Sequence, residues 1–412
     1  MGLHAVRFVV DPGSTVLFCG FLAGGVALGT VSGLTPGIHA NTFALLLAGL
    51  APAVPGPLSY VGAAMLAAGT VHTFLDVVPA LALGVPDPAM AASALPGHRL
   101  VLAGQGREAV RLSALGSAGA VAFAVPLAVP MTRVMTTAYP AVRAHLPVVL
   151  GGVVCLLVLT ESTATAKVGA TLSVAASGLL GLVALDLPAG GPVGAGSMLA
   201  PLFAGLFGAP VLLDALRGGG VPEQAEPTVT TPRAAVAGFA LLGTLAGAVV
   251  GYLPGVSSAV AATLALVVVP GGGARGFLVT TSGVNTANAI FALCALVALG
   301  SPRTGVLVAV ERAGVGVDLP VMVAGVVVGA AAGFVLAVTL GDRYLETVGR
   351  LDYTRLSVGV LGLLVVLVAV LTGPLGVGVF GVASVVGLVP VTVGARRANL
   401  MGVLLVPLAI GA

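Results

Sequence analysis

Long apolar runs, separated by short polar stretches, cover almost the whole chain. A helix needs about 20 apolar residues to cross the hydrocarbon core of a bilayer. Runs close to that length lie at residues 14–31, 109–129, 146–159, 168–187, 196–213, 234–250, 319–340, 356–371, 375–393 and 399–412. Further runs, which are short or interrupted, lie at 38–53, 58–83, 256–269 and 277–299. The pattern predicts an all-α integral membrane protein with about 10–12 transmembrane segments, some of them broken or re-entrant helices.

Two of the interruptions have the same sequence pattern, Gly-x-x-x-Gly-x-x-Pro-Gly. It spans Gly29–Gly37 and recurs 218 residues later at Gly247–Gly255. A second echo, at an offset of 216 residues, relates His72–Pro86 to Asn288–Pro302. We therefore expect two homologous halves, and we favour inverted over parallel repeats. Gly/Pro-interrupted hydrophobic segments at matching places in two halves point to a transporter binding site.

A polar segment separates the two copies. Residues 217–233 are rich in Gly, Pro and Glu, a composition typical of a linker. The sequence thus predicts a first transmembrane half at 1–216 and a second at 234–412. Residues 87–111 and 342–355 are the other long polar connections.

The amino-acid composition indicates that most side chains face lipid or one another and not water. Hydrophobic residues make up 58% of the chain and charged residues 8%, with a mean hydropathy of +1.16. Soluble domains carry about 25% charged residues, so this chain is expected in the lipid bilayer, as a multi-pass protein of the cell membrane. The formal charge of +3 is scattered over loops, and no basic cluster exceeds Arg396-Arg397, so no nucleic-acid partner is expected. Counting basic residues does not decide the membrane orientation.

The Pro-Gly breaks suggest a binding role. Pro lacks a backbone N–H and Gly adopts conformations closed to other residues, so together they end a helix at membrane depth. A restarting helix presents N–H groups suited to a carboxylate, and unwound carbonyls suit a cation. The alternative is that Gly-x-x-x-Gly only packs helices closely.

Polar residues at membrane depth are costly, so those near the breaks are our candidates for substrate or ion binding. These candidates are Pro36, Gly37, His39, Asn41, Thr42, His72, Asp76, Pro254, Gly255, Ser257, Ser258, Asn285, Thr286 and Asn288.

Asp76 is the only acid between residues 12 and 86. A carboxylate there could bind a coupling cation or carry a proton; alternatively, it caps a broken helix or lies at an interface. His39 and His72 could titrate near neutral pH, or be hydrogen-bonded structural residues.

No known cofactor or metal motif accompanies these residues. The three cysteines lack CxxC spacing, and there is no Walker A sequence. We expect no cofactor and no metal centre, while a sodium site is left unassigned. A membrane enzyme acting on a lipid-linked substrate would need clustered acids, which are absent, so we expect no enzyme. A channel or a non-transporting membrane component remains the main alternative.

The repeated motifs resemble those of the large permease subunit of tripartite tricarboxylate transporters, the TctA-like family, in its shorter archaeal-type members. The matching pieces are Gly29–Gly37, Pro79–Pro86, Gly247–Gly255, Thr286–Ala289 and Ala298–Pro302. The chain departs from the family at Asp87 and Arg303, where a Gly-Ile-Pro-Gly turn would end in glycine.

The resemblance implies transport coupled to an ion gradient, with a small membrane subunit and an external solute-binding protein as partners. We therefore expect a secondary active permease for a small solute, an organic anion such as a carboxylate, working by alternating access with Na⁺ or H⁺.

Overall fold

The protein is built from long apolar helices. The computed structural model describes residues 11–36, 43–44, 47–49, 51–84, 91–192, 197–216, 221–253, 258, 261, 265 and 272–411, and every regular element within them is helical. Eight helical stretches are long and apolar enough to cross a membrane. They are α1 (Pro12–Leu34), α3 with α4 (Leu58–Leu75 and Val77–Leu83), α6 (Gly106–Ala144), α8 (Ala164–Ala184), α11 (Arg233–Val250), α13 (Gly273–Leu299), α15 (Leu319–Arg350) and α16 (Tyr353–Val393).

Shorter helices complete the bundle. They are η1 (Ala51–Ala53), α5 (Ala91–Leu102), α7 (Leu146–Leu159), α9 (Leu199–Phe203), the π-helical η2 (Ala204–Gly208), α10 (Ala209–Ala215), α14 (Gly305–Arg312), η3 (Arg397–Met401) and α17 (Gly402–Ile410). The predicted all-α, multi-pass fold is confirmed.

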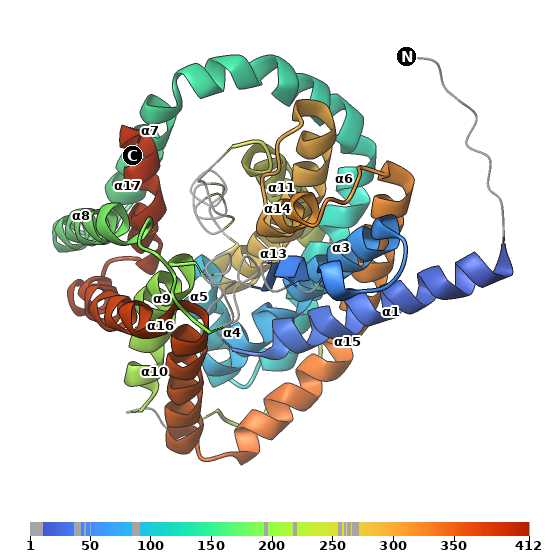
Figure 1. The fold of residues 1–412 in the computed structure, drawn as a ribbon. Coiled ribbons are helices and arrows are strands. Elements are labelled where there is room, and N and C mark those ends of the chain that lie inside the picture. The colour runs from blue at the N-terminus through green and yellow to red at the C-terminus, as the bar shows by residue number, and fades with distance from the viewer. Residues whose placement is uncertain are drawn as a thin grey trace.

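Two helices are longer than the hydrophobic pattern predicts. α6 continues past residue 129 to Ala144 and arches across the molecule (Figure 1). It contains Pro126 and Pro130, and proline bends a helix. α15 continues to Arg350, so most of the expected polar connection at 342–355 is helical. Acidic residues near the end of α15 form ion pairs with arginines of α6. A hydropathy pattern contains no information about such a contact, so it could not predict this extension.

The break in α16 agrees with the prediction of two spans. Gly373 has φ 71° and ψ −169°, and Pro374 follows it. Proline cannot donate to the preceding turn, and glycine reaches positive φ without strain. The spans predicted at 356–371 and 375–393 are therefore the two arms of α16.

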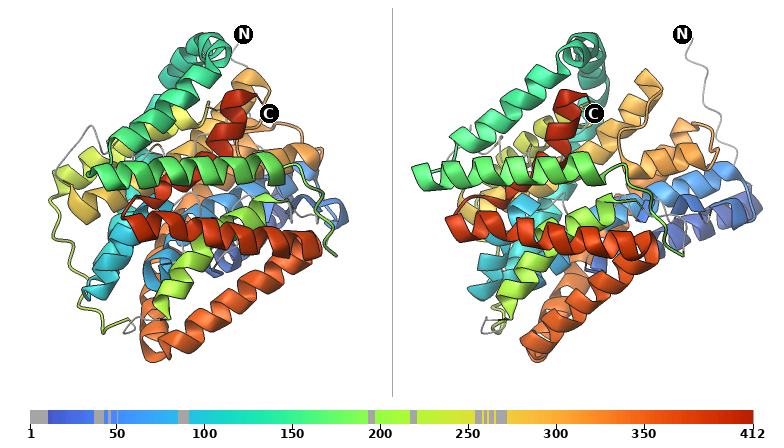
Figure 2. Two further views of the ribbon diagram at one scale, coloured as in Figure 1. Left: turned by 90° about the vertical axis from the view of Figure 1, so that its left-hand side faces the viewer. Right: turned by 60° about the vertical axis from the view of Figure 1, so that its left-hand side comes forward.

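The helices form two groups (Figure 1). The first contains α1, α3, α4, α5, α6, α11, α13, α14 and α15; the second contains α7, α8, α9, α10, α16 and α17. Figure 2 turns the second group toward the viewer and shows α8 beside α16. The helices α3 and α13 are the most buried long helices, and they form the centre of the first group.

The two halves of the sequence interleave in the first group. α3 packs against α1 of its own half and against α15 of the other half. Likewise, α13 packs against α11 of its own half and against α6 of the other. We call α1, α3 and α15 the first trio, and α6, α11 and α13 the second trio.

Glycines let the backbones approach closely within each trio. A Cβ on Gly29 of α1 would lie 2.4 Å from the carbonyl oxygen of Ala68 in α3. A Cβ on Gly247 of α11 would lie 2.7 Å from the carbonyl oxygen of Val284 in α13. Flanking glycines continue both stripes, at Gly25, Gly33, Gly243 and Gly251. The helix-packing interpretation of Gly-x-x-x-Gly is thus correct for these glycines.

The contacts also give helix directions. Gly25 lies beside Ala64 and Gly29 beside Ala68, so α1 and α3 run parallel. Residue numbers also rise together along the contacts of α15 with α3, of α11 with α13, and of α6 with α13. These three pairs of helices are therefore parallel too. Between the trios the order reverses, because residues 107 and 111 of α6 meet 346 and 342 of α15. α1 and α3 therefore run in the opposite direction to α11 and α13.

Candidate functional site

A buried acid and a buried amide join the two trios at the centre of the first group. Asn285 Nδ2 donates a hydrogen bond to Asp76 Oδ2 at 3.1 Å. Each residue is 5% exposed. Asp76 comes from the first half and Asn285 from the second, so the structure brings together two of the predicted residues that lie 209 positions apart.

A helix break positions Asp76. This residue separates α3 from α4, and Pro79 lies three residues beyond it. Proline has no N–H for the carbonyl four residues earlier and clashes with it, so the helix is interrupted just before Pro79. At the 216-residue offset, the position that corresponds to Pro79 is Ala295. Without a proline there, α13 continues unbroken from Gly273 to Leu299. Asp76 keeps helical dihedral angles, φ −57° and ψ −27°, so the interruption in the first half is one residue long. The prediction of a broken helix is wrong for 277–299.

Hydroxyl groups on α13 surround the Asn285 position. Thr280, Thr281, Ser282 and Thr286 are all buried. Ser282 Oγ lies 2.7 Å from Ser113 Oγ of α6, and Thr281 Oγ1 donates to the Phe277 carbonyl. The hydroxyls of Thr280 and Thr286 have no hydrogen-bond partner among the described residues. Burial without a partner is unfavourable for a hydroxyl, so this stretch of α13 is a candidate for binding a polar ligand.

His72 lies one turn before Asp76 and contacts two other elements. Its Nδ1 lies 3.0 Å from Ser32 Oγ of α1, and its ring stacks on Phe43 with the centroids 5.8 Å apart. The residue is fully buried. These contacts agree with a hydrogen-bonded structural histidine, the alternative considered from the sequence.

The Leu-Gly-x-Pro echo marks two equivalent helix ends. Gly84 ends α4 with φ 68°, and Gly300 ends α13 with φ 62°. Only glycine adopts this left-handed conformation without strain. Beyond Gly84, His98 of α5 makes a 2.6 Å hydrogen bond to the Leu81 carbonyl. Burial lowers the pKa of His98, and this hydrogen bond opposes the shift.

The remaining predicted residues fall into two sets. Pro36 lies in the turn after α1, Ser258 is buried, and Asn288 is half-buried on α13. Gly37, His39, Asn41, Thr42, Pro254, Gly255 and Ser257 lie outside the described residues. The role of both Pro-Gly elements therefore stays a prediction.

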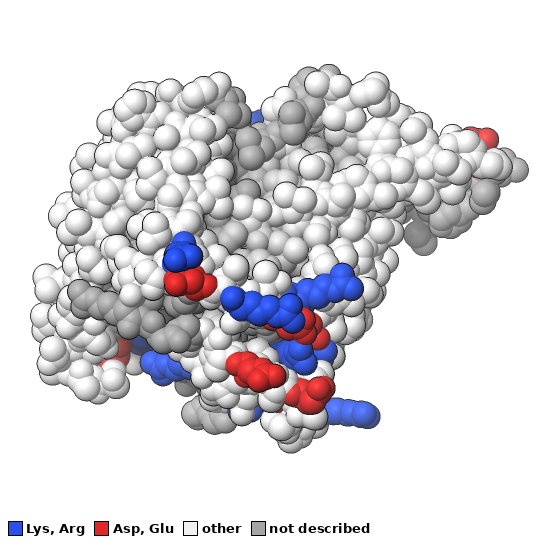
Figure 3. All heavy atoms as spheres, turned by 90° about the horizontal axis from the view of Figure 1, so that it is seen from below, with Lys and Arg blue, Asp and Glu red and all other residues white. Residues whose placement is uncertain are grey.

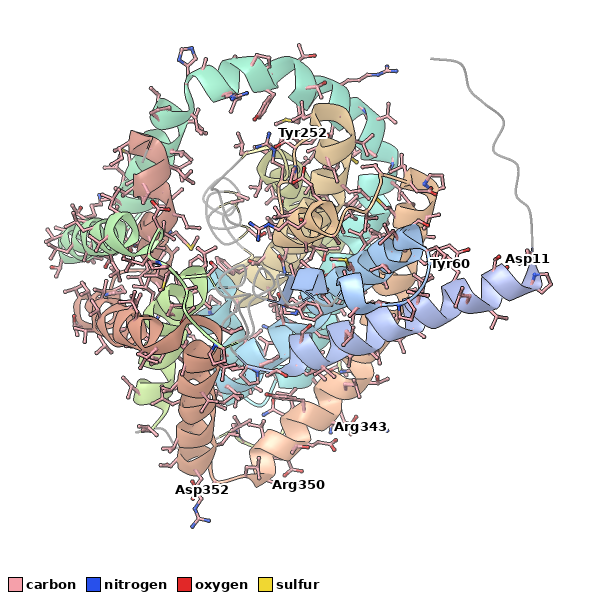
Figure 4. The ribbon with its side chains drawn as sticks, in the orientation of Figure 1. Asp11, Tyr60, Tyr252, Arg343, Arg350 and Asp352 are labelled. Carbon is pink, nitrogen blue, oxygen red and sulfur yellow. The ribbon has the colours of Figure 1, made fainter. Side chains whose placement is uncertain are left out.

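A cluster of charges at one end of the trios was not predicted. We call this surface, formed by the start of α6, the end of α15 and residues 221–232, the charged face. Arg111 makes two hydrogen bonds to Asp342, at 2.9 and 2.8 Å, and Arg107 pairs with Glu346 one turn away. Figure 3 shows the charges gathered in one region of the surface, and Figure 4 places Arg343, Arg350 and Asp352 around the α15–α16 turn at that end. The sequence signal was the four-residue spacing of like charges on each helix.

The predicted linker packs on this face. Glu108 accepts hydrogen bonds from the backbone and side chain of Thr230, at 2.9 and 2.8 Å, and pairs with Arg275 of α13 at 2.8 Å. Gln224 accepts a 2.7 Å hydrogen bond from the Gly106 N–H at the start of α6. Residues 221–232 thus pack against the start of α6, and Val221 also lies near Gly349 at the end of α15.

The donor sets limit the chemistry of the site. Among the described residues, no three or more His, Cys, Asp or Glu side chains gather where they could hold a metal ion. Asp76, Asn285 and the α13 hydroxyls instead offer carboxylate, amide and hydroxyl groups. Such groups can carry a proton, bind an alkali cation or hydrogen-bond a polar solute.

Comparison with known proteins agrees with this architecture. A family model described as the tripartite tricarboxylate transporter TctA family matches residues 19–402. An uncharacterized protein of Methanocaldococcus jannaschii is 25% identical over 399 residues, which cover 94% of this chain and 97% of that protein. No solved structure gives a significant match. The transporter family, together with the eight stretches long and apolar enough to cross a membrane, makes the chain a multi-pass protein of the plasma membrane. Because the family model covers nearly its whole length, the chain belongs to the tripartite tricarboxylate transporter TctA family.

Proposed function

We propose that this protein is a secondary active permease that moves a small organic anion, such as a carboxylate, by alternating access coupled to an ion gradient. The observation that carries the proposal is the buried Asp76–Asn285 contact, where two trios of opposite direction meet. Intramembrane acids are costly and usually functional. At a junction between two bodies, such a group can respond to their relative movement.

The opposite helix directions favour two homologous, inverted repeats, with halves at 1–216 and 234–412 and a linker at 217–233. Inverted repeats give a carrier two related conformations, each open to one side of the membrane. The candidate solute site lies between the repeats, lined by both Pro-Gly elements and by the Asn285 region of α13.

The coupling ion is H⁺ or Na⁺, and Asp76 is its proposed carrier or ligand. The solute would be bound by hydroxyl and amide donors, among them Thr286, Asn288 and Asn285, with help from helix ends. Family membership supports two partners, a small membrane subunit and a solute-binding protein. We expect no cofactor and no enzymatic reaction.

Uptake by the purified protein in proteoliposomes tests this function. With an inward gradient of Na⁺ or H⁺, radiolabelled carboxylate uptake is expected to saturate with solute concentration and to stop when the gradient is dissipated. Asn41→Ala and Asn288→Ala are expected to reduce it. Flux that does not saturate would indicate a channel. Absence of flux for all small acids, with the small membrane subunit and the solute-binding protein included, would rule the proposal out.

A further inference from the structure

The two trios are held together differently at their two ends. At the charged face, Arg111 and Asp342 form a two-pronged ion pair between α6 and α15, and Arg107 and Glu346 form a second pair one turn away. The four side chains are 20–44% exposed. A bidentate arginine–carboxylate pair, with two parallel hydrogen bonds, fixes the relative position of two helices more strictly than a single contact does.

The opposite end of the junction is apolar. There Leu293 and Leu296 of α13 pack in one cluster with Met322 and Val326 of α15. Apolar contact is non-directional and tolerates sliding, whereas a bidentate ion pair is either made or broken. The junction is therefore held by directional ion pairs at the charged face and by non-directional apolar contact at the opposite end.

The other ion pairs of the described helices do not join the trios. Glu108–Arg275 links α6 to α13 inside the second trio, and Glu161–Arg396 lies in the second group. Arg355–Asp352 is a local, exposed pair at the start of α16. Arg111–Asp342 and Arg107–Glu346 are thus ion pairs that join the two trios, one turn apart.

We propose that the Arg111–Asp342 and Arg107–Glu346 pairs are a gate that closes the charged face to the solute in this conformation. The gate opens when α6 and α15 separate, while the Glu108–Arg275 pair keeps α6 with α13 of the second trio. This inference rests on the proposed alternating-access function. It adds which face is closed here and which side chains close it.

Cysteine accessibility tests the gate without any transported solute. Thr281 lies one turn from Asn285 toward the charged face. The rate at which a hydrophilic thiol reagent labels a cysteine at this position measures its accessibility to water. The background is the full chain in detergent with Cys19, Cys155 and Cys294 replaced by Ala. Arg111→Ala is expected to raise the labelling rate of Thr281→Cys at least tenfold. The exchanged pair Arg111→Asp with Asp342→Arg is expected to return it toward the starting rate.

Two controls separate gate opening from general loosening. Arg355→Ala removes an exposed pair and is expected to leave Thr281→Cys labelling unchanged. Ala292→Cys, on the same side of α13 toward the apolar end, is expected to show no increase in Arg111→Ala. Equal labelling of Thr281→Cys with and without the Arg111–Asp342 pair, in protein that elutes as a single folded species, would overturn the gate.

A cross-link gives a second reading in proteoliposomes. A Cβ on Gly341 of α15 would lie 2.8 Å from a methyl group of Val110 in α6, so Val110→Cys with Gly341→Cys is suited to a disulfide. Oxidation is expected to stop uptake and reduction to restore it. Continued uptake with the disulfide formed would overturn the gate, and loss of uptake before oxidation leaves the labelling result to decide. A labelling response without any uptake would instead reject only the proposed function.

Discussion

Replacing Asp76 by Ala is expected to reduce ion-coupled uptake by about 10-fold to 150-fold. A hydrogen bond to a charged group contributes about 1.5–3 kcal/mol, and each 1.4 kcal/mol is about a factor of ten. The variant also leaves the Asn285 amide buried without its acceptor. Initial rates of uptake in proteoliposomes, normalised to reconstituted protein, measure the effect. Asp11→Asn is the matched control, because Asp11 is an exposed cap at the start of α1.

The partner residue gives a pH-dependent version of the same experiment. Asn285→Asp would place two carboxylates about 3 Å apart, where two ionised groups repel each other strongly. Uptake by this variant is expected to be low at pH 7.5 and to recover as the pH falls and the pair takes up a proton. Normal uptake by both Asp76→Ala and Asn285→Asp at neutral pH would show that the contact has no part in transport.

Adding one methyl group to Gly29 is expected to lower the thermal stability of the protein markedly. The new Cβ would meet the Ala68 carbonyl oxygen at 2.4 Å, so α1 and α3 must move apart. Overpacking of this kind costs about 1–3 kcal/mol. Gly247→Ala is expected to do the same to α11 and α13. Thermal unfolding in detergent, followed by the loss of the monodisperse peak, measures both.

The same helices contain their own controls. A Cβ on Gly20 or Gly24 of α1, or on Gly238 of α11, would meet nothing within 4 Å. Alanine at these positions is expected to keep or slightly raise the midpoint of unfolding, since alanine favours helix over glycine. Equal midpoints for Gly29→Ala and Gly24→Ala would show that the close approach of α1 and α3 is not needed for stability.

The apolar pattern was enough to predict most spans and the break in α16. α7 spans Leu146–Leu159, as predicted, because its ends coincide with changes in polarity. The polar end of α15 could not be predicted, since Asp342 on it pairs with Arg111 at the start of α6, 231 residues away in the sequence. Hydropathy describes a segment in lipid, and it carries no information about an ion pair with a distant helix.

The candidate site was predicted as a set of residues and not as a contact. Asp76 and Asn285 were both selected because polar side chains are rare at membrane depth. Their pairing depends on how the trios cross, which the sequence of one chain does not reveal. The sequence shows Pro79 where the matching position is Ala295. The one-residue interruption at Asp76 and the continuous α13 became known only from the structure.

The interleaving of the halves has a consequence for how the protein is made. α3 leaves the ribosome before α15, which packs against it and is synthesised more than 240 residues later. Until then α3 must wait in the membrane with Asp76 uncovered, shielded by lipid, by water or by the insertion machinery. α3 cannot complete its packing before α15 is made, so assembly of the centre has to follow synthesis of α15. Errors late in translation would therefore damage the earliest part of the fold.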